Sequence, residues 1–309
     1  MSKTLLDFVF NVTALAATPA PSVGWLRKVC VVCAPASGVS TRYVEITSEL
    51  SAASYTDNAE IAELFDGGMT SVGLAVASSL GSAEELIDAN DGEFFTVLVS
   101  SDFSGAEGSF ASFPGVVGVS FEATAEGSAE TYAATENRCA FMQKTGATHG
   151  AKNMFYAFGK LLASALRFSN QQFITMPYDD EFGLGDAENY FDERLSFVLT
   201  DDDYGKRLAF LCCGGKAIVA PYVLEEIQIL MQGRALSYIT ANQPAYTKKN
   251  ASRLEDYLEG VYDAYITTGQ IESGSVDVEL LADDFEASAL VTVARPRALW
   301  RVEAEITQE

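Results

Sequence analysis

Strict alternation of apolar and polar residues predicts a short β-strand at each end of the chain. The apolar positions of these two arms are Phe8, Phe10 and Val12 near the N-terminus and Trp300, Val302, Ala304 and Ile306 near the C-terminus. Pro296 separates the second arm from another extended segment. A lone strand leaves its backbone donors and acceptors unpaired, so each arm is expected to pair within its own subunit or with a neighbouring one.

Between the arms, apolar runs alternate with helix-start signals. In the first half, strands are expected at residues 29–34, 94–100 and 116–121, with helices at residues 56–68 and 82–89. In the second half, helices are expected at residues 151–168, 221–236 and 248–267, with strands at 173–176, 196–199, 208–213, 217–220 and 276–280. Helices alternating with strands in this way are typical of an α/β protein.

The predicted fold class is therefore α/β (α+β), with mixed β-sheets, flanking helices and extended terminal β-arms. A change of composition near residues 145–150 suggests a division inside the chain. The expected parts are an N-terminal arm (1–22), the first half of an α/β domain (23–145), a core domain (146–285) and a C-terminal arm (286–309).

The chain is strongly acidic. Its 309 residues include 43 Asp and Glu against 20 Lys and Arg, which gives a net charge of −23. Nucleic acid and anionic membranes are poor partners for that field. The charge suits solubility, a positively charged partner, or adaptation to salt. No apolar run approaches the roughly eighteen residues of a membrane span, so no membrane insertion is expected.

The N-terminal segment also has features of a secretion signal, because Lys3 precedes an apolar stretch and small residues. Asp7 and Asn11 interrupt that stretch, and the alternating-strand interpretation is preferred.

The five cysteines leave two interpretations open. They are Cys30, Cys33, Cys139, Cys212 and Cys213. The Cys30–Cys33 and Cys212–Cys213 pairs lie on predicted strands, where residues three apart or adjacent point to opposite faces and do not converge on a metal ion. Buried structural thiols are one interpretation. Disulfides between subunits of an assembly are the other.

Signals for catalysis are weak. The single histidine, His149, has no nucleophile motif beside it, and Gly214-Gly215-Lys216 lacks the other residues of a phosphate-binding loop. We therefore expect no enzyme activity and no nucleotide cofactor. Acidic clusters such as Asp201–Asp203 suit either a solvated loop or a calcium site.

A small basic cluster stands out in so acidic a chain. Lys248, Lys249 and Arg253 lie at the start of a predicted helix, where the helix dipole disfavours cations. A solvated helix end and a contact with an acidic partner are both consistent with this position.

The order of these elements resembles that of contractile phage tail sheath proteins. The resemblance rests on residues 22–32, 55–73, 238–250, 274–280 and 294–306, and it is one of architecture rather than of a diagnostic motif.

This resemblance implies a structural virion protein of a bacteriophage tail, assembled in the host cytoplasm. Its subunits would form hexameric rings, stack as a helical homopolymer around a tail tube and exchange terminal strands. Contraction would then drive the tube into the host without nucleotide hydrolysis. The implied partners are the tube, baseplate and tail terminator proteins, and Lys248, Lys249 and Arg253 would face the tube.

Two alternatives remain at this stage. One is another self-assembling virion component, either a tail tube or a capsid-associated protein. A tube subunit would be mostly β, whereas this sequence predicts several helices. The other is a hydrolase that uses carboxylates.

Overall fold

The computed structural model describes most of the chain. The described residues are 24–164, 174–179, 182, 184–201, 205–209, 212–214, 216–217, 219–242, 247–281 and 286–294. Both arms, at 8–12 and 300–306, lie outside them. The described residues fall into two compact units, which we call the larger unit (within Ser22–Glu226) and the smaller unit (within Ile227–Glu309).

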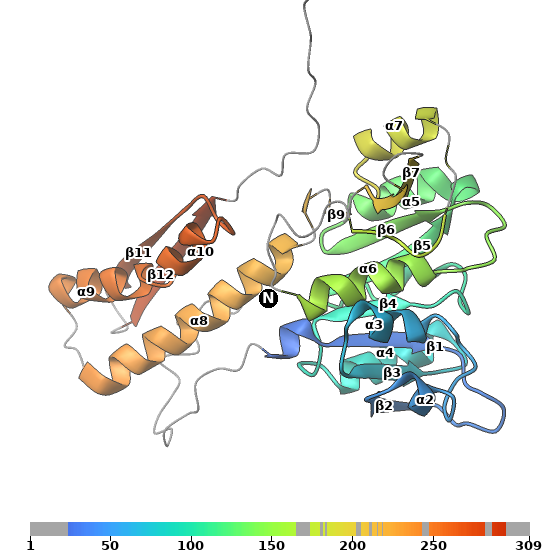
Figure 1. Cartoon of the computed structure of the whole chain (residues 1–309). Helices are drawn as coiled ribbons and strands as arrows, with labels where there is room; N and C mark the ends of the chain where they lie inside the picture. The colour runs from blue at the N-terminus through green and yellow to red at the C-terminus, as the bar shows by residue number, and fades with distance from the viewer. Residues whose placement is uncertain are drawn as a thin grey trace, which may run out of the picture. The chain divides into compact units, whose positions relative to one another are not determined.

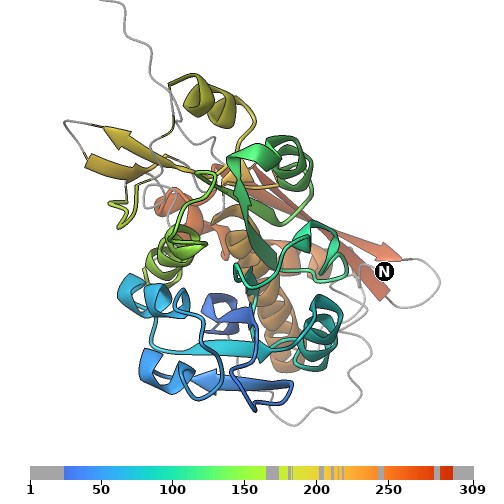
Figure 2. The same ribbon diagram turned by 90° about the vertical axis from the view of Figure 1, so that its right-hand side faces the viewer.

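A six-stranded mixed sheet forms the centre of the larger unit (Figures 1 and 2). Its strands are β1 (Val29–Cys33), β2 (Arg42–Ile46), β3 (Val72–Val76), β4 (Thr96–Val99), β5 (Val116–Glu122) and β6 (Arg138–Gln143). Their order is β2-β3-β1-β4-β5-β6, and only β2 is antiparallel to its neighbour. The chain adds β3 on one side of β1 and β4 to β6 on the other, so the strand order reverses between β1 and β4.

Continuous burial explains the central strands. Every residue of β1, β3 and β4 is buried, as is typical of parallel strands covered on both faces. The predicted strands at 29–34, 94–100 and 116–121 correspond to β1, β4 and β5. The mixed α/β fold class is thus confirmed.

Short helices surround this sheet. They are η1 (Gly24–Arg27), α2 (Glu49–Ala52), α3 (Ile61–Gly67), α4 (Leu80–Ala89), η2 (Ala106–Gly108), η3 (Ala123–Ala125), α5 (Glu126–Ala133) and α6 (Lys152–Ala163). Helix α4 begins before the predicted start at residue 82, because Ser79 caps it by accepting a hydrogen bond from the Ser82 amide (3.2 Å).

Helices α3 and α6 pack against each other through glycines. A Cβ atom added at Gly159 would lie 2.7 Å from the Leu64 carbonyl oxygen and 2.9 Å from the Gly67 Cα. Only glycine at both positions permits this approach. The predicted boundary between residues 145 and 146 falls inside the larger unit, where this packing joins its two sides.

A buried arginine organises the loop before β5. The side chain of Arg138, only 5% exposed, donates hydrogen bonds to the carbonyl oxygens of Phe110 (2.7 Å), Phe113 (3.3 Å) and Gly115 (3.3 Å). Phe110 has a left-handed backbone (φ 59°), and its amide donates to Glu84 (2.5 Å). The loop is therefore fixed from both sides by side chains distant in sequence.

The larger unit continues with α7 (Leu184–Asp192), two small antiparallel sheets and the start of α8 (Val219–Asn242). The sheets pair β7 (Val198–Asp201) with β8 (Gly205–Leu208) and β9 (Cys212–Cys213) with β10 (Lys216–Ala217). The single strand predicted at 208–213 is therefore wrong, because β8 ends at Leu208. The strand predicted at 217–220 is also wrong in its second half, since α8 begins at Val219.

Tyr222 anchors the first turns of α8 to the central sheet. Its hydroxyl lies 2.5 Å from Thr96 Oγ1, and its ring packs edge-on against Phe95 (centroids 5.3 Å apart). Complete burial raises the pKa of Tyr222 above its ordinary range.

The smaller unit contains the rest of α8, α9 (Lys248–Glu259), α10 (Tyr262–Thr267) and the hairpin of β11 (Ser273–Leu281) with β12 (Glu286–Ala294). The single helix predicted at 248–267 is interrupted at Gly260, so α9 and α10 are separate. Tyr262 packs onto Gly274, where an added Cβ would lie 2.7 Å from the ring, and its hydroxyl donates to Ser275 O (3.2 Å).

Within the described residues, no helix is both long enough and apolar enough to cross a membrane.

Candidate functional site

The β11–β12 hairpin is a sheet of only two strands. Among the described residues, no third strand pairs with either of them. On β11, the Val278 amide donates to the Glu255 carboxylate of α9 (2.8 Å). Glu255 therefore occupies this one backbone amide of β11. Strand edges that have no neighbouring strand can accept a further one, by the same kind of backbone hydrogen bonds that hold the hairpin.

Strand β12 overlaps the predicted C-terminal arm. It occupies the first residues of the range 286–309 and pairs along its whole length with β11 of the same chain. Residues 286–294 of the predicted arm are therefore paired within this chain, and the remainder of the arm lies outside the described residues.

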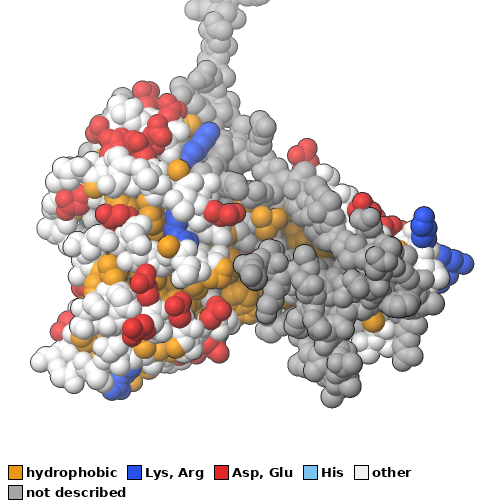
Figure 3. Space-filling model, turned by 180° about the vertical axis from the view of Figure 1, so that it is seen from behind, with side chains coloured by type: hydrophobic (Ala, Val, Ile, Leu, Met, Phe, Trp, Pro, Cys, Tyr) orange, Lys and Arg blue, Asp and Glu red, His pale blue; other side chains and the backbone are white. Residues whose placement is uncertain are grey.

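The predicted tube-contact residues lie on one helix. Lys248, Lys249 and Arg253 are all exposed on α9, whereas Leu254 and Leu258 on the same helix are buried. Thr247 caps the helix by accepting a hydrogen bond from the Asn250 amide (3.3 Å). Figure 3 shows Lys and Arg side chains at the right-hand edge, and further Lys and Arg side chains among the more numerous Asp and Glu side chains of the larger unit. The contact with a tube stays a prediction.

The larger unit has a cavity of about 740 Å³ at the carboxyl ends of its parallel strands. In doubly wound folds, ligands bind at this edge, where the strand order reverses. Here Asp102, which follows β4, fills that place. Its Oδ2 atom accepts hydrogen bonds from the Ala34 amide (3.0 Å), Asn58 Nδ2 (3.1 Å) and Ser100 Oγ (3.1 Å).

A second carboxylate, Glu60, occupies the N-terminal end of α6. Glu60 is 4% exposed, and it accepts hydrogen bonds from the Ala151 amide (2.7 Å) and the Ser101 amide (3.0 Å). Gly150 leaves room for it, because a Cβ at that position would overlap Glu60 Oε1. Anionic ligands bind at helix N-termini such as this one. The protein's own carboxylates therefore take the positions that a phosphate group would need.

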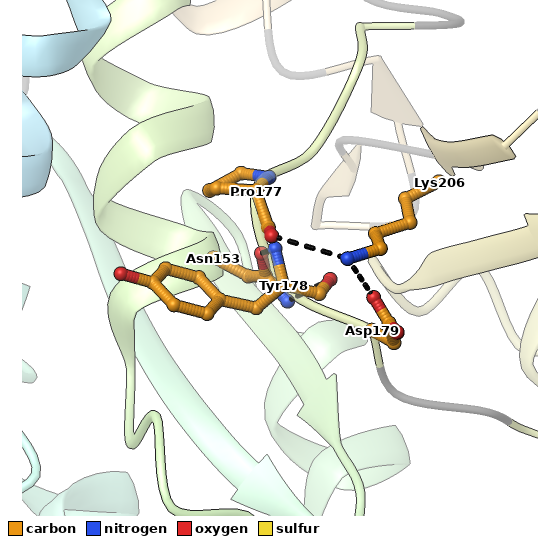
Figure 4. A network of polar contacts seen from close by, with 5 residues as sticks. All are labelled: Asn153, Pro177, Tyr178, Asp179 and Lys206. Atoms are coloured by element: carbon orange, nitrogen blue, oxygen red, sulfur yellow. Dashed lines mark hydrogen bonds and ion pairs between the residues drawn. The ribbon is translucent and has the colours of Figure 1, made fainter.

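A polar network joins α6 to the segment at 177–179 (Figure 4). The Asn153 side chain donates to Tyr178 O (3.1 Å) and accepts from the Tyr178 amide (3.3 Å). Lys206 of β8 forms an ion pair with Asp179 and donates to Pro177 O (3.4 Å). The Tyr178 hydroxyl donates to Glu63 (2.6 Å), and this hydrogen bond raises the pKa of Tyr178 to about 12.

His149 stacks on the Tyr178 ring (centroids 5.4 Å apart), and its Nδ1 atom lies 3.1 Å from Gly150 O. These contacts place it in a packed loop beside α6. Over the described part of the chain, no three His, Cys, Asp or Glu side chains are arranged to hold a metal ion.

Four of the five cysteines are buried free thiols, namely Cys30, Cys33, Cys139 and Cys213. Burial raises the pKa of Cys33 and Cys139 to about 12, so the reactive thiolate is suppressed at neutral pH. Burial therefore favours the structural interpretation of these four over disulfides between subunits. The side chain of Cys212 lies outside the described part of the chain.

Sequence reasoning missed Glu60, Asp102 and Tyr178. Their partners lie between 2 and 115 residues away along the chain, and no local pattern distinguishes them from other surface acids or aromatics.

Comparison with known proteins gives matches only at the level of structure. No family model matches the sequence, and neither does any curated protein. The helical sheath of the anti-feeding prophage in its contracted state matches with a TM-score of 0.61 and 10% identity, over 96% of this chain and 99% of that one.

Two further structures show the same likeness. A chain of the contracted anti-feeding prophage baseplate matches with a TM-score of 0.64 and 10% identity, over 96% of both chains. The sheath tail protein of Desulfitobacterium hafniense matches with a TM-score of 0.55 and 8% identity, over 92% of this chain and all of that one. The chain therefore has the fold of contractile tail sheath proteins, almost from end to end.

Proposed function

We propose that the chain is a structural subunit of a contractile tail sheath, which acts by assembly and not by catalysis. The observation that carries this proposal is the match over 96% of the chain and 99% of the anti-feeding prophage sheath subunit. The shared fold thus includes the smaller unit and its hairpin as well as the sheet. The carboxylates at the ligand edge of that sheet agree with a role that needs no cofactor.

In this proposal the hairpin is the acceptor for arms from neighbouring subunits. The two-stranded β11–β12 sheet offers backbone edges, and the arms at 8–12 and 300–306 have the alternating pattern of strands. Such exchange would link subunits into stacked hexameric rings. The links would persist while the larger units reorient during contraction and drive the tube into the host.

The remaining partners follow from this role. The exposed basic residues of α9 would contact the tail tube, and the ends of the polymer would meet the baseplate and tail terminator proteins. The protein would act in the tail of the virion after assembly in the host cytoplasm.

Deletion of residues 295–309 tests the arm exchange. We expect tubular polymers in negative-stain electron microscopy of the full chain and a folded, non-polymerising protein after the deletion. A more specific test compares two single substitutions in the same arm. Val302→Asp changes its apolar face, and Glu303→Gln changes its charged face. Only the first should abolish the polymers, because it places a charge in the shared sheet. Intact polymers after the deletion would refute the exchange.

Charge reversal on α9 tests the tube contact. Lys248→Glu combined with Lys249→Glu should weaken co-sedimentation of the sheath with its tube by about tenfold, since interfacial charge reversal costs more than 1 kcal/mol. The control combines Arg42→Glu with Lys160→Glu, which alters net charge equally on the larger unit. Equal co-sedimentation of both variants would count against α9 as the tube-facing helix.

A further inference from the structure

A second hollow lies beside the cavity at the edge of the six-stranded sheet. Lysine side chains predominate among the charged groups that line the second hollow, whereas carboxylates predominate in the first. This basic hollow, of about 590 Å³, is lined by the loop that follows β6, the first turn of α6, the segment at 177–179 and β8. Three ammonium groups line it, from Lys144, Lys152 and Lys206, together with His149. Asp179 is the one carboxylate among its described lining residues.

The adjoining cavity makes the contrast clear. It shares Ala147, Thr148, His149 and Lys152 with the basic hollow. Its carboxylates are Asp57, Glu60, Asp102, Glu107 and Glu122. A positive surface and a negative surface therefore meet along the loop before α6, in a protein that has only 20 cationic residues against 43 acidic ones.

The cations of the basic hollow come from separate elements, and two of them are held in place. Lys206 is fixed by Asp179 and Pro177 O, as Figure 4 shows. The Lys152 ammonium lies 5.3 Å from the centre of the Tyr178 ring, and Tyr178 is itself fixed by Asn153 and Glu63. Lys144 is exposed at the rim. Cationic side chains that line one hollow attract carboxylates to it.

We propose that the basic hollow is a docking site for carboxylate side chains of a second copy of this chain. The proposal rests on the proposed function, since it supplies a contact between larger units in addition to arm exchange. A second copy is the fitting occupant because its own charged groups are predominantly carboxylates.

The contact has a geometric consequence. A basic hollow on one copy and an acidic surface on the next are different patches, so the interface is heterologous. Heterologous contacts produce rings or open helical arrays rather than closed dimers. The docking contact is thus of the kind that a helical polymer requires.

The test is self-association of the full chain in sedimentation velocity, at low and at high ionic strength. Lys144→Glu, at an exposed rim position, and the pair Lys144→Glu with Lys152→Gln should each weaken association at low salt by about tenfold or more. They should also flatten its dependence on salt, because an attractive ion contact is lost. Lys160→Glu is the matched control, since it lies on α6 outside the hollow and alters net charge as Lys144→Glu does.

The outcomes separate the two proposals. If association produces small oligomers but never tubes, and the hollow variants still weaken it, docking stands and the sheath function fails. If the variants form tubes as readily as the wild type, docking is overturned and the sheath function stands. A wild type that stays monomeric at low salt overturns docking as well.

A further experiment uses inorganic phosphate as the probe. Phosphate should compete with association in the wild type and have no such effect in the Lys144→Glu variant. Phosphate binding at His149, followed by its NMR signal, without any effect on association would show a small-anion site and overturn the docking of a second copy.

Discussion

The two units differ in how the edges of their sheets are satisfied. In the larger unit, the outer edge of β6 is covered by the residue-196 segment, where the Met142 amide donates to Ser196 O (2.7 Å) and the Ser196 amide donates to Ala140 O (3.0 Å). The opposite edge strand, β2, exposes the charged residues Arg42 and Glu45. In the smaller unit, β11 and β12 have no third strand among the described residues.

This difference in edge protection indicates which unit can fold without strands from a partner. Covered edges and exposed charges are the usual ways in which a protein prevents further strand pairing. An isolated two-stranded sheet is marginal and gains stability from added strands. The larger unit therefore has the features of an independent folding unit, whereas the smaller unit has those of a receptor for other strands.

The largest expected effect comes from breaking the glycine contact in the larger unit. Gly159→Val should lower its free energy of unfolding by about 3 kcal/mol, because the new side chain meets the Leu64 carbonyl and the Gly67 backbone. Hydrogen exchange should report the loss in β1 and β4 before β11 and β12. Gly127→Ala is the control, since a Cβ there meets nothing within 4 Å. Equal loss of protection in the hairpin would contradict the independence of the two units.

A smaller effect is expected at the hairpin. Glu255→Ala removes the acceptor of the Val278 amide and should cost about 1 kcal/mol, measured by hydrogen exchange of β11. Within assembled polymers the loss should shrink, because added strands stabilise the same sheet. Asp256→Ala, on the next position of α9, serves as the control. An equal loss in monomer and polymer would argue against strand addition at this hairpin.

The smallest effect concerns alkaline pH. The pKa of Tyr178 rises from the ordinary value of 10 to about 12, chiefly through the hydrogen bond to Glu63. The folded protein therefore keeps a proton that the unfolded chain loses above pH 10. The stabilisation is complete below pH 10 and disappears as the pH rises towards 12.

Chemical denaturation of the wild type and Tyr178→Phe at several pH values measures this contribution. The difference in unfolding free energy between them should be constant below pH 10 and decrease above it. Other buried tyrosines titrate in both proteins and cancel in the comparison. A difference that does not change with pH would show that the Tyr178 hydroxyl does not lose this proton.

The sequence predicted those parts of the fold that local patterns determine. β1, β4 and β5 are continuous apolar runs, and the helix signals near Ile61 and Pro221 identify α3 and α8. β2 was missed because its exposed Arg42 and Glu45 obscure the apolar pattern. β6 was missed because it begins with a charged residue, Arg138, whose burial depends on carbonyl groups 23 to 28 residues away.

The residues of the candidate site were likewise predictable only where a local sequence pattern places them. The exposure of Lys248, Lys249 and Arg253 on one helix follows from helical spacing, which the sequence shows. The basic hollow was not predictable, because Lys144, Lys152 and Lys206 meet only after the β8 strand returns to α6. Likewise, nothing near Glu60 in the sequence indicates that it caps a helix 91 residues later.

Helix α8 also has a mechanical consequence. It is one uninterrupted helix from Val219 to Asn242, and Tyr222 in its first turns is bonded to Thr96 at the start of β4. A pull applied along the first turns of α8 is therefore delivered, through Tyr222, to a central strand of the larger unit. Tension delivered there must shear several parallel strands at once, whereas tension on an edge strand would unzip them singly.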